Sequence, residues 1–306
     1  MIPAVITTAD LIIERPQKHA HAIFVSAGDR ETFATFALDT LTDSFDVIVF
    51  QYGSSKEKRA RFERDATAFA TGMGTKLNAL RILFRDRPKL FERYTTIWAC
   101  DDDLVLEHGD YRLLPKISAA LGVDVLSPAH SIKGKISHQI MLPTLGRHFF
   151  RYTNFVEMTC PLFLVSALAA FLDRYDGSLR GYADEWWFLW ALGANKNAVA
   201  GIADCVTIIN PHNFLKPGGY GEVELQAERS ILRLYWLAAM EKYGMKEWPA
   251  KTLSYVSHND AAVSALGNAA LFRRPFKDIV QTAIAALNYK LRFYGIRKRL
   301  SQALRL

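Results

Sequence analysis

The chain has 306 residues, of which 50% are hydrophobic and 23% are charged, and this composition excludes a disordered protein. At about 150 residues per domain, the length allows one domain or two. The longest mostly apolar run, residues 160–172, is shorter than the ~20 residues of a membrane-spanning helix. No basic segment precedes the apolar residues of the N-terminus, so we expect no secretory signal and a cytoplasmic protein. Cys100, Cys160 and Cys205 are widely spaced in apolar stretches and are expected to be reduced core thiols.

The positive charge is concentrated at the C-terminus. The chain has a net charge of +7, and residues 271–306 contain nine basic residues and one acidic residue, which leaves −1 for residues 1–270. Apolar residues recur at helical spacing in 275–306, which predicts a basic amphipathic helix. Such a helix suits an anionic membrane surface, with packing on its own domain as the alternative. We therefore divide the chain into a main domain (1–245), a connection (246–274) and a basic helical tail (275–306).

The first half alternates short β-rich runs with amphipathic segments, as is typical of an α/β fold. We expect strands at 22–27, 45–52, 94–100 and 123–126, and helices at 31–41, 56–71, 75–84 and 113–121. A long loop is expected at 130–151. It is followed by strands at 154–160 and 199–209, helices at 162–172, 183–192 and 222–243, and an irregular segment at 246–267. The predicted fold is a mostly parallel sheet with helices on both faces.

Three adjacent carboxylates, Asp101, Asp102 and Asp103, follow the predicted strand 94–100. Like charges at this spacing repel one another unless a cation lies among them, and oxygen ligands favour Mg²⁺ or Mn²⁺. Side chains alternate along an extended backbone, so Asp101 and Asp103 are expected on one side and Asp102 on the other. The end of a strand is also where open α/β sheets bind ligands. The alternative is an acidic turn before the next helix.

A second acidic motif, Asp184-Glu185, opens the aromatic helix 183–192. Adjacent helical residues diverge by about 100°, so one carboxylate is expected to be chemical and the other supporting. Tyr182, Trp186 and Trp187 are candidates for an apolar wall of a binding site, or for core residues.

His212 follows the predicted strand 199–209 and can complete a metal site that carboxylates begin. Lys216 lies in the glycine-containing segment that follows, and it can neutralise a diphosphate. His138, His148 and Glu157 are weaker candidates for residues that line the site.

Together, these motifs resemble those of the GT-A glycosyltransferases over residues 22–220. The shared features are strands that end in nucleotide-facing turns, a helix with Lys76 and Arg81, a strand that runs into D-x-D, and a later acidic pair. The resemblance implies a sugar donor activated by a nucleoside diphosphate, with UDP as the expected nucleotide, and a GT-A-like sheet. It also implies that Asp101 faces the ribose or the metal, that Asp102 lies at the nucleotide, and that Asp103 binds the metal.

The resemblance further implies roles for the other motifs. The nucleotide would lie at Ser26, Asp29, Gln51 and Tyr52, and the diphosphate at Lys76 and Arg81. In inverting members, a carboxylate at the place of Asp184 or Glu185 removes the proton from the acceptor hydroxyl. Some retaining members have a histidine followed by Lys-Pro, which is similar to His212 and Lys216, although the spacing is shorter here.

The predicted function is a metal-dependent glycosyltransferase that acts on a glycan or lipid-linked acceptor and can attach to the inner face of a membrane. No nucleic-acid motif accompanies the basic tail. One alternative is an aspartate-nucleophile phosphohydrolase, because residues 101–105 also fit D-x-D-x-[TV]. Another is a non-catalytic sugar-binding protein at a membrane surface. A sugar nucleotidyltransferase would need a glycine-rich loop that residues 26–30 do not provide.

Overall fold

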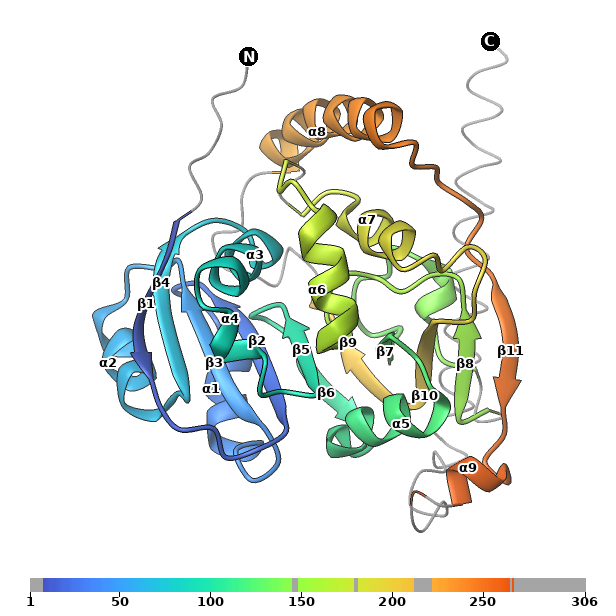
Figure 1. The fold of residues 1–306 in the computed structure, drawn as a ribbon, viewed down its shortest axis with the longest axis horizontal. Helices are drawn as coiled ribbons and strands as arrows, with labels where there is room; N and C mark the ends of the chain where they lie inside the picture. Colours follow the sequence, from blue (N-terminus) through green and yellow to red (C-terminus); the bar gives the residue numbers. More distant parts are fainter. Residues whose placement is uncertain (1–7, 145–147, 179–180, 212–221, 265, 267–306) are drawn as a thin grey trace.

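A computed structural model describes residues 8–144, 148–178, 181–211, 222–264 and 266. These residues form one mixed sheet with helices on both faces (Figure 1). The predicted His212, Lys216 and tail (275–306) lie outside the described residues. Within the described part, no helix is long and apolar enough to cross a bilayer.

The described sheet has eleven strands: β1 (Thr8–Glu14), β2 (His21–Ala27), β3 (Asp46–Gln51), β4 (Ala68–Met73), β5 (Thr96–Cys100), β6 (Val105–His108), β7 (Val125–His130), β8 (Phe150–Thr153), β9 (Leu162–Leu164), β10 (Ala200–Ile209) and β11 (Thr252–Val256). Their order is β1-β4-β3-β2-β5-β9-β7-β10-β8-β11, and β6 pairs with β10. Strands β2, β3, β4, β5, β7, β10 and β11 run in one direction, and the other four run opposite to them. The mostly parallel α/β fold is therefore confirmed.

The described helices are α1 (Phe33–Thr40), α2 (Lys56–Asp65), α3 (Lys76–Asp86), α4 (Pro88–Phe91), α5 (Leu114–Leu121), α6 (Val165–Arg174), α7 (Asp184–Ala191), α8 (Glu222–Tyr243) and α9 (Ala261–Ser264). Side chains of β2 alternate between two cores, with Phe24 in one and Val25 in the other. The core that contains Phe24 also contains residues of α3, α6, α7 and α8, whereas the other contains residues of α1, α2 and α5. All three cysteines are buried.

The structure corrects four element assignments. Residues 68–73, assigned in part to a helix, form β4, and residues 162–164, expected to begin a helix, form β9 before α6. No strand covers 154–160, and the segment expected to be irregular contains β11, which pairs with β8. Short apolar runs such as 162–164 fit a strand or a helix equally well, and only pairing with β5 and β7 decides between them. The division at residue 245 stays a prediction.

Candidate functional site

The carboxyl ends of four parallel strands lie side by side at one edge of the sheet. Strand β2 pairs with β3 on one side and β5 on the other, and β4 pairs with β3, all in parallel. Each strand is followed by a turn that holds predicted site residues. This edge therefore brings together the sequence motifs of the first hundred residues.

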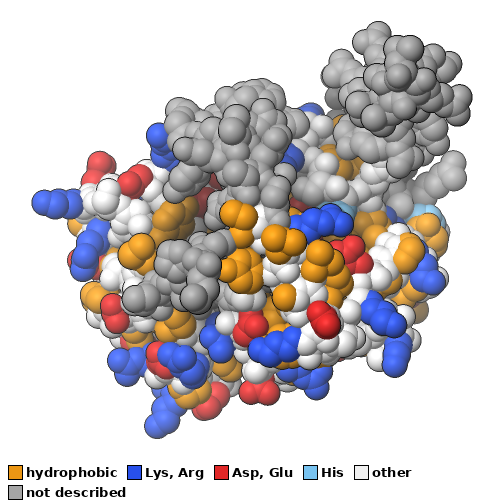
Figure 2. Space-filling view, turned by 90° about the horizontal axis from the view of Figure 1, so that it is seen from above, with side chains coloured by type: hydrophobic (Ala, Val, Ile, Leu, Met, Phe, Trp, Pro, Cys, Tyr) orange, Lys and Arg blue, Asp and Glu red, His pale blue; other side chains and the backbone are white. Residues whose placement is uncertain are grey.

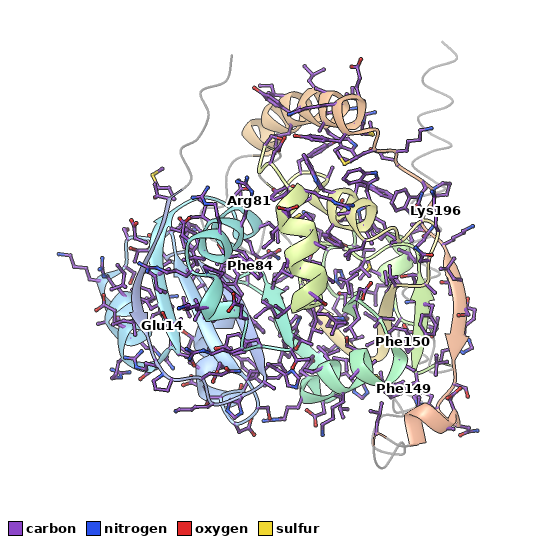
Figure 3. All side chains as sticks on the ribbon, in the orientation of Figure 1. Glu14, Arg81, Phe84, Phe149, Phe150 and Lys196 are labelled. Atoms are coloured by element: carbon purple, nitrogen blue, oxygen red, sulfur yellow. The ribbon has the colours of Figure 1, made fainter. Side chains whose placement is uncertain are left out.

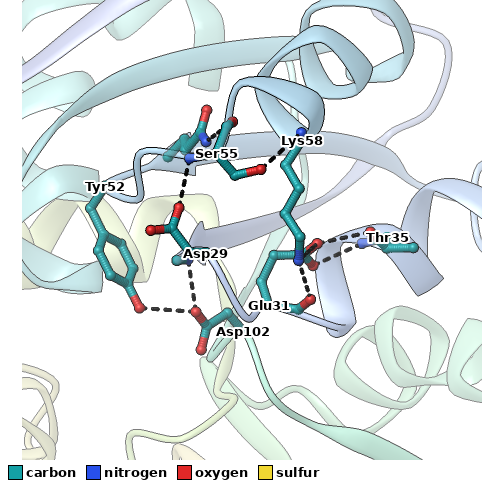
Figure 4. A network of polar contacts seen from close by, with 9 residues as sticks. Asp29, Glu31, Thr35, Tyr52, Ser55, Lys58 and Asp102 are labelled. Atoms are coloured by element: carbon teal, nitrogen blue, oxygen red, sulfur yellow. Dashed lines mark hydrogen bonds and ion pairs between the residues drawn. The ribbon is translucent and has the colours of Figure 1, made fainter. Parts of the chain in front are cut away.

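Asp102 ties three of these strand ends together (Figure 4). Its Oδ2 accepts hydrogen bonds from the backbone N–H of Gly28 and the hydroxyl of Tyr52, each at 2.9 Å. Its carbonyl oxygen accepts the N–H groups of Thr32 and Phe33 at the start of α1. Burial raises the pKa of Asp102, against the effect of these hydrogen bonds. Asp102 is thus engaged within the protein, on a different side from Asp101.

The turns after β2 and β3 are joined through Asp29. Its carboxylate accepts the backbone N–H of Ser55 at 2.7 Å (Figure 4). It also accepts the hydroxyl of Ser54 at 3.0 Å, and these hydrogen bonds lower the pKa of Asp29. A Cβ atom at Gly53 would lie 2.5 Å from Asp29 Oδ1 and 2.6 Å from the Asp29 nitrogen. Only glycine allows the two turns to approach this closely.

The other residues predicted at the nucleotide lie on the same strand ends. Ser26 and Gln51 are buried, and Gln51 donates to the carbonyl of Ser55 at 3.0 Å. Tyr52 is 49% exposed although its hydroxyl is bound to Asp102. One face of this aromatic ring is therefore available beside the strand ends.

Lys76, the first residue of α3, binds Asp101. Its ammonium donates to Asp101 Oδ1 at 2.8 Å and to the carbonyls of Met158 and Thr159 at 2.7 and 2.8 Å. These three bonds account for the three N–H donors of the lysine, whose side chain is only 4% exposed. In this structure Lys76 holds Asp101 and residues 158–159 in place, rather than facing solvent.

Arg81, which was predicted beside Lys76, lies further along α3 (Figure 3). Its charge acts on the hydroxyl of Tyr175, whose pKa is raised mainly by burial. The two predicted diphosphate ligands therefore have different partners.

Asp184 is a buried carboxylate at the start of α7. It accepts the hydroxyl of Tyr175 at 2.9 Å and the N–H of Gly181 at 3.0 Å. Complete burial raises the pKa of Asp184 to about 7. The preceding residue, Ala183, has a φ of 56°, and no other non-glycine residue of the described ranges has a positive φ. The turn before α7 is thus held in a conformation that costs an alanine about 1 kcal/mol or more.

Glu185 does not share the partners of Asp184. This agrees with the prediction that the side chains of adjacent helical residues point in different directions. Its Oε1 lies 3.7 Å from Nε2 of His138, and 11% of its side chain is exposed compared with 32% for His138. The His138 ring also packs on Phe155, with ring centroids 4.4 Å apart. Burial lowers the pKa of His138, but Glu185 and Glu157 outweigh this effect and raise it overall.

A buried pair, His130 and Glu157, lies between the two acidic motifs. His130 Nδ1 is 3.5 Å from Glu157 Oε2, and the side chains are 0% and 8% exposed. Burial lowers the pKa of His130 to about 4, against the attraction of Asp101, and burial raises the pKa of Glu157. Since Asp101 acts on His130 and Glu157 acts on His138, the acidic triplet and the acidic pair belong to one electrostatic neighbourhood.

The segment that carries His138 is anchored to the sheet by a buried ion pair. Arg151 of β8 binds both carboxylate oxygens of Asp204 in β10, at 2.8 and 2.9 Å. Arg151 also donates to the carbonyls of Ile140 and Leu142, and Asp204 accepts the N–H and hydroxyl of Thr144. These bonds fix residues 140–144 directly after His138.

The aromatic residues beside the acidic pair divide into core and site residues. Trp187 is fully buried and donates to the carbonyl of Arg174. Tyr182 and Trp186 are partly exposed, and Trp186 makes edge contacts with Phe155 and Trp248. His148 instead packs on Tyr255 of β11, with ring centroids 4.2 Å apart.

Sequence reasoning did not single out His130 or Tyr175. His130 ends β7, and the rule that drew attention to Asp101 and His212 at strand ends applies to it equally. Tyr175 follows α6 and is recognised only through its bond to Asp184.

Within the described residues, no group of three or more His, Cys, Asp and Glu side chains is arranged to hold a metal ion. The predicted third ligand, His212, lies outside them. Asp101 is bound to Lys76 through Oδ1 and keeps 39% of its side chain exposed. Asp103, two residues further on, is also partly buried. Carboxylate oxygens are the ligand type that a hard cation prefers.

No family model and no curated protein matches the chain. Among solved structures, the chain is similar to TarS 1–349 from S. aureus, at 13% identity and a TM-score of 0.41, over 62% of this chain and 60% of that one. A longer TarS structure matches at 12% identity and a TM-score of 0.41, over 63% of this chain and 37% of that one. TarS 1–349 in complex with UDP-GlcNAc matches at 12% identity and a TM-score of 0.39, over 66% of this chain and 61% of that one. These scores are too low for a function to be transferred.

Proposed function

We propose that the chain is a glycosyltransferase that moves a sugar from a nucleoside-diphosphate sugar to a hydroxyl group of a glycan or lipid-linked acceptor. The observation that carries this proposal is the position of Glu185. It is a nearly buried carboxylate with an imidazole 3.7 Å away, and a buried His130–Glu157 pair connects it electrostatically with the carboxylates at the strand ends.

The donor nucleotide is proposed to lie over the ends of β2 and β3. Tyr52 offers a half-exposed ring for stacking on the base, and Asp29, Ser26 and Gln51 lie beside it. UDP is the proposed nucleotide. Lys76 and Asp102 have a positioning role in this proposal, because both are bound within the protein.

A divalent cation, Mn²⁺ or Mg²⁺, is proposed to be held by Asp101 and Asp103, with His212 as a further ligand. When bound, it neutralises the charge that develops on the departing diphosphate. Lys216 and Arg81 are the proposed additional diphosphate contacts. The carboxylate oxygens at the end of β5 support this assignment, because they are the ligand type that these cations prefer.

In an inverting reaction, Glu185 acts as the general base. The acceptor oxygen forms a bond to C1 of the sugar, and its proton passes to a carboxylate oxygen of Glu185. The bond between C1 and the diphosphate oxygen breaks, and its electron pair leaves with the diphosphate. Asp184 has a supporting role in this step, because its carboxylate is buried and bound to Tyr175 and Gly181.

A membrane surface is the proposed location of the acceptor. Ile231, Leu234, Tyr235 and Leu237 of α8 are exposed. Figure 2 shows hydrophobic side chains gathered in the middle of the face seen from above, with charged side chains around them. Together with the basic composition of 275–306, this exposure supports peripheral attachment.

The test is a thermal-shift screen with nucleoside diphosphates and nucleotide sugars, with and without Mn²⁺, followed by transfer assays. We expect one nucleotide to stabilise the protein only with Mn²⁺, and D103A to lose this effect. E185Q should keep the stabilisation and lose roughly 10²–10⁴-fold in turnover, the typical contribution of a general base.

Two other outcomes would contradict the proposal. Stabilisation by vanadate or fluoroberyllate, with hydrolysis of phosphate esters, would indicate the phosphohydrolase. Sugar binding that survives D103A, without transfer of a sugar, would indicate a binding protein.

A further inference from the structure

His138 contacts Glu185, yet the transfer chemistry described above gives the imidazole no part. The ring nitrogen Nε2 faces the Glu185 carboxylate, and the ring itself is fixed between that contact and Phe155. Residues 140–144 cannot move independently of the sheet, because Arg151 and Asp204 bind them. The imidazole is therefore presented to Glu185 by a rigid support.

We propose that His138 is a positioning residue for Glu185 and that its imidazole orients the carboxylate toward the acceptor hydroxyl. This inference rests on the proposed function, because it assigns the partner of the proposed base. An imidazolium beside a carboxylate favours the ionised form of that carboxylate.

The groups around His138 support a charged imidazole. Glu185 faces it from α7, and Glu157 acts on it from the segment before β9. A positive charge on His130 would oppose this arrangement, because His130 and His138 repel each other when both are protonated. Lys135 acts in the other direction, because it favours the ionised form of Glu157. His130 is held neutral near pH 7 by its burial, since its pKa is about 4. The net environment therefore attracts a proton to His138, in agreement with its raised pKa.

The proposal is tested with H138Q and H138K, both of which lose the ring contact with Phe155, so that the difference between them reports the charge. We expect H138Q to lower kcat roughly 10-fold at pH 6 and to move the acidic limb of the kcat profile to higher pH. H138K should restore the position of that limb. Stabilisation by the nucleotide should be equal in all variants, because His138 acts on the acceptor side.

A double-mutant cycle with E185Q separates positioning from a structural role. If His138 acts through Glu185, H138Q has no further effect on residual turnover in the E185Q background. If H138Q lowers turnover equally in both backgrounds, or leaves the pH profile unchanged, the inference is wrong while the proposed function stands. If E185Q itself keeps full transfer activity, the proposed base is wrong, and this failure is distinct from the first.

Discussion

The ammonium of Lys76 lies 2.8 Å from Oδ1 of Asp101, and the same nitrogen binds two backbone carbonyls from residues more than eighty positions away in the chain. One buried side chain thus connects the end of β5 with the segment that follows Glu157. The carboxylate of Asp101 is therefore held in position by a protein cation.

Replacement of Lys76 by methionine tests this connection. We expect K76M to lower the free energy of unfolding by about 2–3 kcal/mol, because two carbonyls lose their donor and Asp101 loses its cation. Urea denaturation measures the loss. K133M is the matched control, since Lys133 is 65% exposed and pairs with Glu107 at 2.8 Å, and it should cost less than about 1 kcal/mol. Equal losses in both variants, or a loss of nucleotide affinity alone in K76M, would contradict the positioning role.

Gly53 is expected to tolerate no side chain. In G53A the new Cβ would collide with Asp29, including its backbone nitrogen 2.6 Å away, so the turns after β2 and β3 must separate at a cost of about 1–3 kcal/mol. Stabilisation by the nucleotide should fall as well. In G122A the Cβ meets nothing within 4 Å, and the variant bears only the strain of a φ of 63°, about 1 kcal/mol. Unchanged nucleotide binding in G53A would show that the two turns do not form the donor site.

Asp184 makes stability depend on pH in a defined direction. Its pKa in the folded state is about 7, above the ordinary value of 3.8, so between these values the folded state binds the proton more tightly. The contribution of Asp184 to stability is therefore present at low pH and is lost as the pH rises toward 7 and above. The side chain introduced by D184N cannot ionise, and its amide can still accept from Gly181 and donate to Tyr175.

We therefore expect D184N to gain stability relative to the unmodified chain between pH 4 and pH 8. Denaturation of both proteins at a series of pH values measures this difference, in which the contributions of other buried carboxyl groups cancel. A constant difference across the range would mean that Asp184 does not titrate as its burial requires.

Loss of one partner of the Arg151–Asp204 pair is expected to lower the free energy of unfolding more than replacement of both partners by apolar residues. R151M leaves a buried carboxylate and two carbonyls without their donor, which should cost about 3–5 kcal/mol. In R151M/D204L the unpaired charge is gone, so the double variant should recover part of this loss. If both variants are equally unstable, the energetic contribution lies in the carbonyls of Ile140 and Leu142 rather than in the ion pair.

The parts of the fold that sequence predicts best are buried strands with β-branched and aromatic residues, such as β2, β3 and β5. Strand β4, with the sequence Ala-Phe-Ala-Thr-Gly-Met, lacks that signal and is specified by pairing with β3. Strand β9 has three residues and exists only between β5 and β7. Local propensity is too weak to predict such elements, because tertiary contacts determine them.

The candidate site also contains residues that the sequence predicts and residues that it does not. The acidic triplet and the acidic pair are recognisable because they follow or begin predicted elements. The divergence of Asp184 and Glu185 follows from helical geometry, but which one faces the core depends on the hydroxyl of Tyr175. The partners of Lys76 and His138 come from distant segments, so no local pattern in the sequence contains them.

The left-handed backbone of Ala183 restricts which amino acids can occupy that position in any chain that builds the same turn. Glycine, asparagine and aspartate adopt this conformation readily, whereas valine, isoleucine and threonine do not. A related sequence with a branched residue immediately before its acidic pair would have to enter the helix differently and would aim its carboxylates elsewhere. The residue before the pair therefore offers a simple marker for sorting related chains by the direction in which the proposed base points.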